Sequence, residues 1–153
     1  MTYLFVFLLT FVFMEFVAWF AHKYVMHGLL WKLHEDHHTK ESSHSFLEQN
    51  DSFFIIFATP AIIFILIASI SYAPYLLIIG LGITAYGLCY FLVHDVFIHN
   101  RLKFLNKIDN FYFRAIRRAH KIHHKKIHKE DGECFGMLIV PFKYLKAELK
   151  KDK

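Results

Sequence analysis

Three long apolar stretches constrain the fold of this chain more than any other feature. They cover residues 3–21, 53–70 and 75–93. At about 1.5 Å of rise per residue, a helix over each stretch is long enough to cross a hydrocarbon core of about 30 Å. The second and third are separated only by SYAP, which predicts a helical hairpin. The first has no basic start and no cleavage pattern, so we expect a retained membrane helix and not a signal peptide.

Composition agrees with an all-α integral membrane protein. Of the 153 residues, 56% are hydrophobic and 18% aromatic, above the usual content of a soluble domain. No linker rich in Pro, Gly or Ser divides the chain, so we expect one membrane-embedded domain over 1–153. Cys89 and Cys134 form no CxxC motif, which argues against a disulfide scaffold and favours a reducing compartment.

Prolines modify two of the apolar segments. Pro60 lies inside the second stretch and predicts a kink, because proline removes a backbone donor and clashes with the preceding turn. A fourth apolar segment, CFGMLIVPF at 134–142, is too short to cross a membrane. We expect this segment to lie at the interface or to re-enter the membrane partway.

Ten of the twelve histidines fall in four tight groups. In order these are HxxxxH, HxxHH, then the hairpin, then HxxxxH and HxxHH again. If the first stretch exits the membrane at His22, the hairpin leaves and returns on that same side, so all four groups share one membrane face. The groups are His22 and His27; His34, His37 and His38; His94 and His99; His120, His123 and His124.

Basic residues predict which face this is. Fifteen of the eighteen Lys and Arg residues lie at or after residue 101, and the other three, Lys23, Lys32 and Lys40, are on the histidine side too. The positive-inside rule makes that side cytoplasmic and predicts a histidine-rich helical cap there. The segment RRAHKIHHKKIHK has the charge for nucleic acid, but beside membrane spans it favours topology and contact with the lipid bilayer. We expect no nucleic-acid partner.

The spacing within the groups is suited to metal. The first, fourth and fifth positions of HxxHH share one helix face, so two or three imidazoles can converge on one ion. The offset of five in HxxxxH leaves two side chains about 140° apart on an ideal helix, so that pair requires a helix end or a bulge. Gly28 and Asn100, which follow the two pairs, would permit one.

Ten imidazoles are more than one ion can use, so we predict a two-metal site with about five ligands each. Structural zinc sites usually include cysteine, and no cysteine lies within the groups. The ExxH pairs of ferritin-like di-iron sites are also absent. Imidazole suits several metals. We favour a pair of irons, because a reactive metal pair would account for the apolar interior beside the site. His44 and His128 lie outside the groups.

Four carboxylates are candidates to support the ligands. Glu35, Asp36 and Asp95 adjoin histidines and could accept an imidazole N–H, although solvation at the surface is an equal alternative for Glu35 and Asp36. Glu15 lies two helical turns before His22, inside an apolar span where a carboxylate is costly and usually paired. We expect Glu15 to contact the ligand cluster or to stay protonated.

The order of the four histidine groups between membrane spans resembles the fatty acid hydroxylase superfamily. FMEFVAWFAHKYVMHG, LHEDHH, YFLVHDVFIHNR, RRAHKIHHK and KEDGECFGMLIVPFKYL are similar to its bacterial carotenoid branch, and the short chain favours that branch over the fatty acid and sterol members. The resemblance implies a non-haem di-iron monooxygenase of the bacterial inner membrane. It would use O₂ and reduced ferredoxin to hydroxylate C3 of β-ionone rings, taking β-carotene through β-cryptoxanthin to zeaxanthin.

The resemblance also implies the site residues. Its metal ligands are the ten grouped histidines, holding two iron ions. Basic residues around the last group could steer an acidic ferredoxin toward the irons. These candidates for ferredoxin docking are Arg114, Arg117, Arg118, Lys121, Lys125, Lys126 and Lys129.

Three alternatives remain open at the level of the sequence. One is a fatty acyl or sterol hydroxylase of the same superfamily. Another is a membrane protein that transports or stores metal, but the hairpin offers little beyond Ser, Thr and Tyr for a polar path. The last is a structural zinc protein without oxygen-dependent turnover.

Overall fold

The computed structural model describes residues 1–39, 47–102, 105, 107–130 and 132–151. Within these residues the fold contains helices and no strand, which confirms the all-α prediction. The elements are α1 (Thr2–Phe20), η1 (Ala21–Leu29), α2 (Trp31–His38), η3 (Gln49–Asp51), α3 (Ser52–Ser71), α4 (Pro74–Phe91), η4 (Leu92–Ile98), α5 (Phe111–His123) and α6 (Phe142–Leu149).

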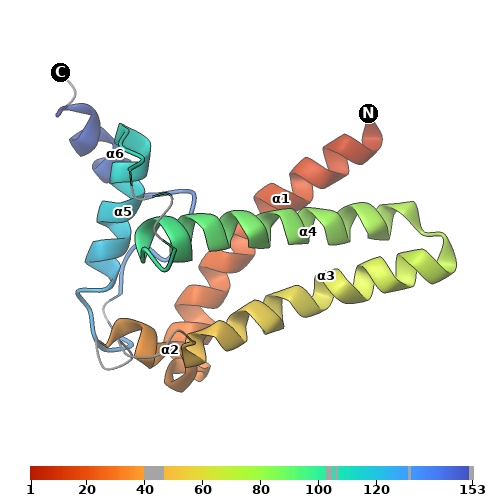
Figure 1. The fold of residues 1–153 in the computed structure, drawn as a ribbon, viewed down its shortest axis with the longest axis horizontal. Coiled ribbons are helices and arrows are strands. Elements are labelled where there is room, and N and C mark those ends of the chain that lie inside the picture. Colours follow the sequence, from red (N-terminus) through yellow and green to blue (C-terminus); the bar gives the residue numbers. More distant parts are fainter. Residues whose placement is uncertain (40–46, 103–104, 106, 131, 152–153) are drawn as a thin grey trace.

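Among the described residues, three continuous helices are long and apolar enough to cross a membrane, as predicted. They run over Thr2–Leu29, Gln49–Ser71 and Pro74–Ile98. Figure 1 shows α3 and α4 as an antiparallel hairpin, with α1 crossing beside α4. Helix α3 continues through Pro60. Large apolar side chains such as Leu8, Ile62 and Leu88 remain exposed on the three helices, as expected of surfaces that face lipid.

Small residues allow the spans to pack closely. Ala18 of α1, Ala61 of α3 and Ile83 of α4 belong to one buried apolar cluster. A Cβ added to Gly82 would lie 2.9 Å from the Cβ of Thr10, so glycine is needed where α4 approaches α1. Close approach through small residues is the usual way that membrane helices gain contact, because lipid supplies no hydrophobic force between them.

Two spans end as π-helices. η1 continues α1 and η4 continues α4, each with hydrogen bonds from residue i+5 to residue i. The N–H of Leu30 donates to the carbonyl of Val25 at 2.7 Å, and the N–H of His99 donates to that of His94 at 3.0 Å. The wider turn rotates later residues relative to an α-helix. His22 and His27 lie in η1, and His94 lies in η4 with His99 directly after it.

The remaining helices form a cap at one end of the bundle. Figure 1 shows α2, α5 and α6 at the end away from the N-terminus and from the turn between α3 and α4. Asn110 starts α5, because its side-chain oxygen accepts from the N–H groups of Tyr112 and Phe113, both at 3.0 Å. Ala115 and Ile116 on the apolar face of α5 form a second core with Val93.

Residues 134–142, the fourth apolar segment of the sequence, pack into this second core. Met137 and Val140 are buried there, whereas Ile139 and Phe142 are exposed. The backbone of 137–139 contacts Glu15, which lies within the first span. The segment therefore packs against the helix that carries Glu15.

Candidate metal centre

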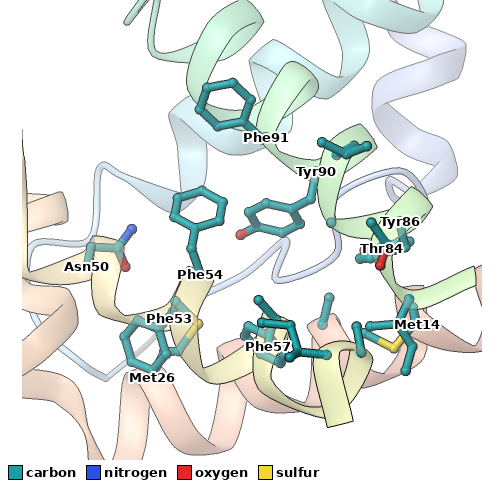
Figure 2. Close-up of a pocket in the computed structure, with 17 residues that line it drawn as sticks. Met14, Met26, Asn50, Phe53, Phe54, Phe57, Thr84, Tyr86, Tyr90 and Phe91 are labelled. Atoms are coloured by element: carbon teal, nitrogen blue, oxygen red, sulfur yellow. The ribbon is translucent and has the colours of Figure 1, made fainter. Parts of the chain in front are cut away.

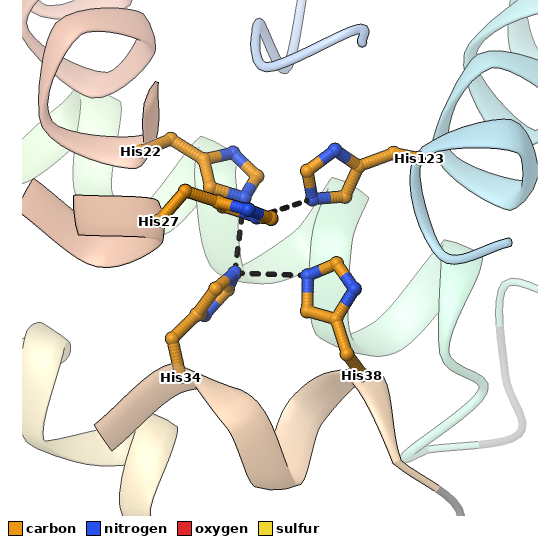
Figure 3. A group of neighbouring side chains, drawn as sticks. All are labelled: His22, His27, His34, His38 and His123. Atoms are coloured by element: carbon orange, nitrogen blue, oxygen red, sulfur yellow. Dashed lines mark hydrogen bonds between the residues drawn. The ribbon is translucent and has the colours of Figure 1, made fainter. Parts of the chain in front are cut away.

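Five histidines form the first group, and they come from three different elements. One ring nitrogen from each histidine lies within 4.8 Å of the corresponding nitrogens of the other four. Figure 3 shows the rings pointing toward a common space between η1, α2 and α5. All five are buried. The first group comprises His22, His27, His34, His38 and His123.

Four histidines form the second group, within the same limit of 4.8 Å. His37 comes from α2, His94 from η4 and His120 from α5. The fourth is His99, directly after η4. Each HxxHH motif is therefore divided between the two groups, and neither motif serves one ion alone. Adjacent positions on a helix differ by about 100°, so a helix that lies between two centres can supply both.

The π-helices bring the two histidines of each HxxxxH pair together. In a π-helix, residue i+5 returns to the face of residue i. The ring centroids of His22 and His27 are 5.2 Å apart, and those of His94 and His99 are 4.6 Å apart. The predicted distortion is present, but Gly28 does not adopt a positive φ, whereas Asn100 does (φ 53°). The pair geometry therefore comes from the π-turn and not from a glycine break.

His124, the tenth histidine, lies between the groups. Its ring centroid is 4.4 Å from that of His120 and 4.5 Å from that of His38. Its Nε2 is buried without a hydrogen-bond partner in the described part of the chain. An unpaired buried ring nitrogen is costly unless a ligand satisfies it. His128 is exposed, and His44 lies outside the described residues.

Most of the histidines have their outer ring nitrogen, Nδ1, beside an oxygen acceptor. In the first group, Nδ1 of His22, His27, His38 and His123 donates to the backbone carbonyls of Phe135 (3.0 Å), Lys129 (3.3 Å), Lys126 (3.0 Å) and Glu133 (3.0 Å). Nδ1 of His34 donates to Asn50 at 2.7 Å. In the second group, Nδ1 of His37 donates to Glu48 at 2.9 Å, and that of His94 to Asp95 at 3.0 Å. These bonds place the ring proton on Nδ1 and leave Nε2 as an acceptor.

The inner nitrogens consequently face one another without a proton to share. Nε2 atoms of His22 and His34, of His27 and His123, and of His34 and His38 are 3.1 Å apart, along the dashed lines of Figure 3. Burial lowers the pKa of His34 and of His123 to about 2, so neither imidazole gains a second proton at neutral pH. Converging lone pairs in a buried space fit a metal cation.

The spacing of these nitrogens is compatible with metal binding. Nε2 contacts in both groups measure 2.9 to 3.1 Å. With a metal–nitrogen bond of about 2.1 Å, two nitrogen ligands of one ion lie about 3.0 to 3.4 Å apart, depending on the angle between them. Both histidine sets could therefore hold a metal ion.

The structure places the predicted carboxylates unequally. Asp95 lies beside His94 and also accepts from Arg101 at 3.0 Å. Glu35 is exposed on α2, and Asp36 accepts from the backbone N–H of Gln49 at 2.6 Å. Glu15 makes its hydrogen bonds one step away from the histidines, with Tyr86 and with the backbone of 137–139. Contact of Glu15 with the cluster is therefore indirect.

Sequence reasoning missed Glu48, Asn50 and Arg101. Glu48 and Asn50 sit just before α3, at the same end of the bundle as α2, and each accepts from a histidine of α2. Arg101 joins Asp51 (2.8 Å) to Asp95 (3.0 Å). In the sequence, Glu48 and Asn50 belong to a polar cluster directly before the second apolar stretch, on the predicted histidine side. That cluster could have revealed them as partners of the histidines.

Basic residues near the last histidine group differ in their surroundings. Arg117 donates to the carbonyl of Phe97 at 3.3 Å and lies over its ring, and Arg118 pairs with Glu148 at 2.9 Å. Arg114 pairs with Asp109 at 2.9 Å. The lysines of this segment are exposed instead. They are Lys121, Lys125, Lys126 and Lys129.

An apolar pocket of about 390 Å³ lies between α1, α3 and α4. Figure 2 shows Phe53, Phe54 and Phe57 along one wall and Tyr90 opposite them. Asn50, which accepts from His34, also lines the pocket. The Tyr90 ring lies 5.0 Å from that of His94. The pocket is therefore lined in part by residues that contact both histidine groups.

Known proteins resemble this chain over most of its length. The curated beta-carotene hydroxylase of Pantoea ananas is 41% identical over 128 residues, which cover 84% of this chain and 71% of the relative. That of Paracoccus sp. (strain PC1) is 36% identical over 154 residues, covering 99% and 93%. A chloroplastic beta-carotene 3-hydroxylase of Gentiana lutea is 36% identical over 136 residues, covering 84% of this chain and 40% of the relative.

No solved structure matches the chain. The sequence profile of the family described as Fatty acid hydroxylase matches residues 7–144, a range that includes all four histidine groups. This match and the coverage of the relatives confirm the resemblance carried by the histidine spacing. The chain is a member of the fatty acid hydroxylase family.

Proposed function

We propose that the protein hydroxylates C3 of β-ionone rings, converting β-carotene through β-cryptoxanthin to zeaxanthin. The observation that carries the proposal is the apolar pocket, whose lining includes Asn50 and Tyr90, neighbours of the two histidine groups. The names of the curated relatives support the substrate class.

Two iron ions fit the histidine sets. The first group would hold one ion, and the second group with His124 would hold the other. Bound iron would supply the activation of O₂ that attack on an unactivated C–H bond requires. Overall, one atom of O₂ is inserted into a C–H bond of the ring. The other atom is reduced to water by two electrons and two protons. The reaction therefore requires an external electron donor.

The protein's own residues bind and orient the hydrocarbon. Burying apolar surface contributes roughly 25 cal/mol per Å², so a wall of Phe and Met side chains retains a ring without polar contacts. Phe53, Phe54 and Met26 lie at the histidine end of this wall. The pocket can hold one end of a long carotenoid, whose remainder would extend between the spans. Exclusion of water from the pocket confines oxidation to the bound ring.

Outer hydrogen bonds keep the histidines ready to bind metal. Each Nδ1–H that donates to a carbonyl or carboxylate fixes both the ring orientation and the tautomer. Burial lowers the pKa of His37 and His120 as well, so the imidazoles remain neutral ligands at physiological pH.

Reduced ferredoxin is the proposed electron donor. Exposed lysines at the end of α5 adjoin His123 and His124, so an acidic protein that docks there would approach the metal centre closely. The arginines of the predicted patch take part in contacts within the fold. We therefore assign docking chiefly to Lys121, Lys125, Lys126 and Lys129. The excess of basic residues on this end supports a cytoplasmic face of the bacterial inner membrane.

The test is chromatography of pigments from a bacterial host that makes β-carotene and a ferredoxin system. With the wild-type chain we expect β-cryptoxanthin and zeaxanthin. The matched control is His37→Ala, which removes a buried histidine of the second group and should leave β-carotene unchanged. Unchanged β-carotene with the wild-type chain, present in the membrane, would contradict the proposal; hydroxylated fatty acyl chains or sterols would then identify the alternative substrate, and their absence would favour metal handling.

A further inference from the structure

We infer that Glu15 is a positioning residue that connects the first histidine group to the wall of the apolar pocket. Glu15 lies in the C-terminal half of α1 with 6% of its surface exposed. Its hydrogen bonds go to Tyr86 and to three backbone amides, so it acts on the histidines through other residues. The inference rests on the proposed metal centre and adds a residue to it.

One oxygen of Glu15 holds a backbone turn. Oε1 accepts from the N–H groups of Met137 (2.9 Å), Leu138 (2.9 Å) and Ile139 (2.8 Å). A Cβ added to Gly136 would lie 3.2 Å from this oxygen and 2.7 Å from the carbonyl oxygen of Ile139, so glycine permits the turn to close around the carboxylate. Three consecutive amide donors in an apolar surrounding need such an acceptor.

The same turn continues into the residues that orient the first histidine group. We call residues 133–139 the strap. Within the strap, the carbonyl of Phe135 accepts from Nδ1 of His22, and the carbonyl of Glu133 accepts from Nδ1 of His123, both at 3.0 Å. The Phe135 ring packs edge-on against His22, His27 and His123, with centroids 5.1 to 5.5 Å away. Fixing the strap therefore fixes three of the five rings.

The other oxygen of Glu15 reaches the pocket. Oε2 accepts from the hydroxyl of Tyr86 at 2.7 Å, and Tyr86 is a buried residue of the pocket wall. One carboxylate thus sets the position of a pocket side chain and of the strap together. A carboxylate inside a membrane span is expensive, and four donors explain how this one is accommodated.

The second histidine group has separate support. His37 and His94 donate to Glu48 and Asp95, and Arg101 contacts Asp95. Glu48 lies before α3, Asp95 lies in η4 and Arg101 follows η4, so the hydrogen-bond partners of His37 and His94 are not part of the strap. Removing Glu15 should therefore disturb one metal position and leave the other in place.

The experiment compares full-length variants in detergent, each loaded with ⁵⁷Fe(II). Iron per chain and the Mössbauer spectrum are measured for the wild type, Glu15→Ala, Glu15→Gln and Glu148→Gln. We expect about two irons in the wild type and about one in Glu15→Ala, with one of two iron signals lost. Glutamine keeps an oxygen for the strap amides and should restore most of the missing iron.

The control Glu148→Gln alters another buried glutamate. Glu148 lies on α6 and pairs with Arg118 of α5 and with Lys151. This variant should keep both irons. Two irons with a wild-type spectrum in Glu15→Ala, or equal losses in Glu15→Ala and Glu148→Gln, would overturn the inference.

Glu15→Asp covers the case in which Glu15→Ala does not fold. The shorter side chain should retain two irons but change one iron signal, because the strap must move to reach the carboxylate. An unchanged spectrum would overturn the positioning role alone. A wild-type chain that binds no iron would overturn the proposed metal centre and the inference with it.

Discussion

At the scale of the residue, one hydrogen bond decides what each imidazole can do. Nδ1 of the first group faces neutral oxygens, those of four backbone carbonyls and of Asn50. Nδ1 of His37 and His94 in the second group faces carboxylates. A carboxylate partner raises the basicity of a ligand imidazole. The two groups therefore offer different electron donation from the same residue type.

His123 tests the ligand set directly. Its side chain is fully buried in the first group, so His123→Ala removes a ligand and leaves a hole in the centre. We expect loss of hydroxylation by more than the 10- to 100-fold typical of changes to residues that support ligands, with membrane insertion retained. Pigment chromatography and membrane fractionation measure the two quantities.

His128 provides the control, because it is exposed near the end of the same basic segment. His128→Ala should keep most activity. The sequence predicts a similarly mild effect for His44, which lies outside the described residues. Full activity in His123→Ala, or complete loss in His128→Ala, would contradict the assigned ligands.

At the scale of the element, the π-helices are the feature that makes the spans suitable for a metal site. An α-helix with HxxxxH would direct the two rings apart, whereas η1 and η4 bring each pair together. The helix continues through the distortion, so the rings remain attached to rigid membrane spans. Precise placement of a metal site benefits from such support.

Two glycines should respond differently to alanine. Gly82→Ala forces a Cβ to 2.9 Å from Thr10 and to 3.2 Å from the carbonyl oxygen of Phe7, so α1 and α4 must separate. We expect destabilisation of about 1 to 3 kcal/mol. Gly28→Ala meets no atom within 4 Å and should be neutral or slightly stabilising, since alanine favours a helical backbone. Thermal unfolding of both variants in detergent, followed by circular dichroism, measures the difference; equal melting temperatures would contradict it.

At the scale of the whole molecule, the three spans bring every histidine group to one end. The N-terminus and the turn at Tyr72 lie at the other end (Figure 1). This arrangement lets distant parts of the chain share one centre while the apolar pocket stays between the spans. In the proposed function, substrate would reach the histidines from lipid, and electrons would reach them from water.

Labelling of cysteines tests this topology. In a background without Cys89 and Cys134, we expect a membrane-impermeant thiol reagent to label Tyr72→Cys from the outside of intact cells. Lys125→Cys should be labelled only after the membrane is opened, because the proposed topology places the basic end in the cytoplasm. Labelling of both positions from the same side would contradict three crossings between the N-terminus and the cap.

The exposed lysines test the docking surface. Changing Lys121, Lys125, Lys126 and Lys129 to Glu should lower ferredoxin-supported turnover about tenfold at low salt and weaken its dependence on salt. Iron content should stay at the wild-type level, which separates docking from metal loss. Lys150→Glu, a change at the exposed residue directly after α6, serves as the control. Unchanged turnover and salt dependence in the fourfold variant would exclude this surface.

The sequence by itself determined the features that depend on local pattern. Apolar length predicted the three spans, and the number and spacing of histidines predicted a metal centre at one membrane face. Offsets of five residues also predicted a distortion at the end of each span. These properties follow from helix geometry and from the bilayer thickness, so neighbouring residues suffice to reveal them.

Only the tertiary structure decided how those features combine. His34 and His38 of α2 join the first group and His37 joins the second, because the helix lies between the two centres. The acceptors that fix the rings, such as the carbonyl of Phe135 and the side chain of Glu48, are far from their histidines in sequence. Glu15 likewise meets the amides of 137–139 across more than a hundred residues. Such contacts depend on how whole elements pack, which no local pattern specifies.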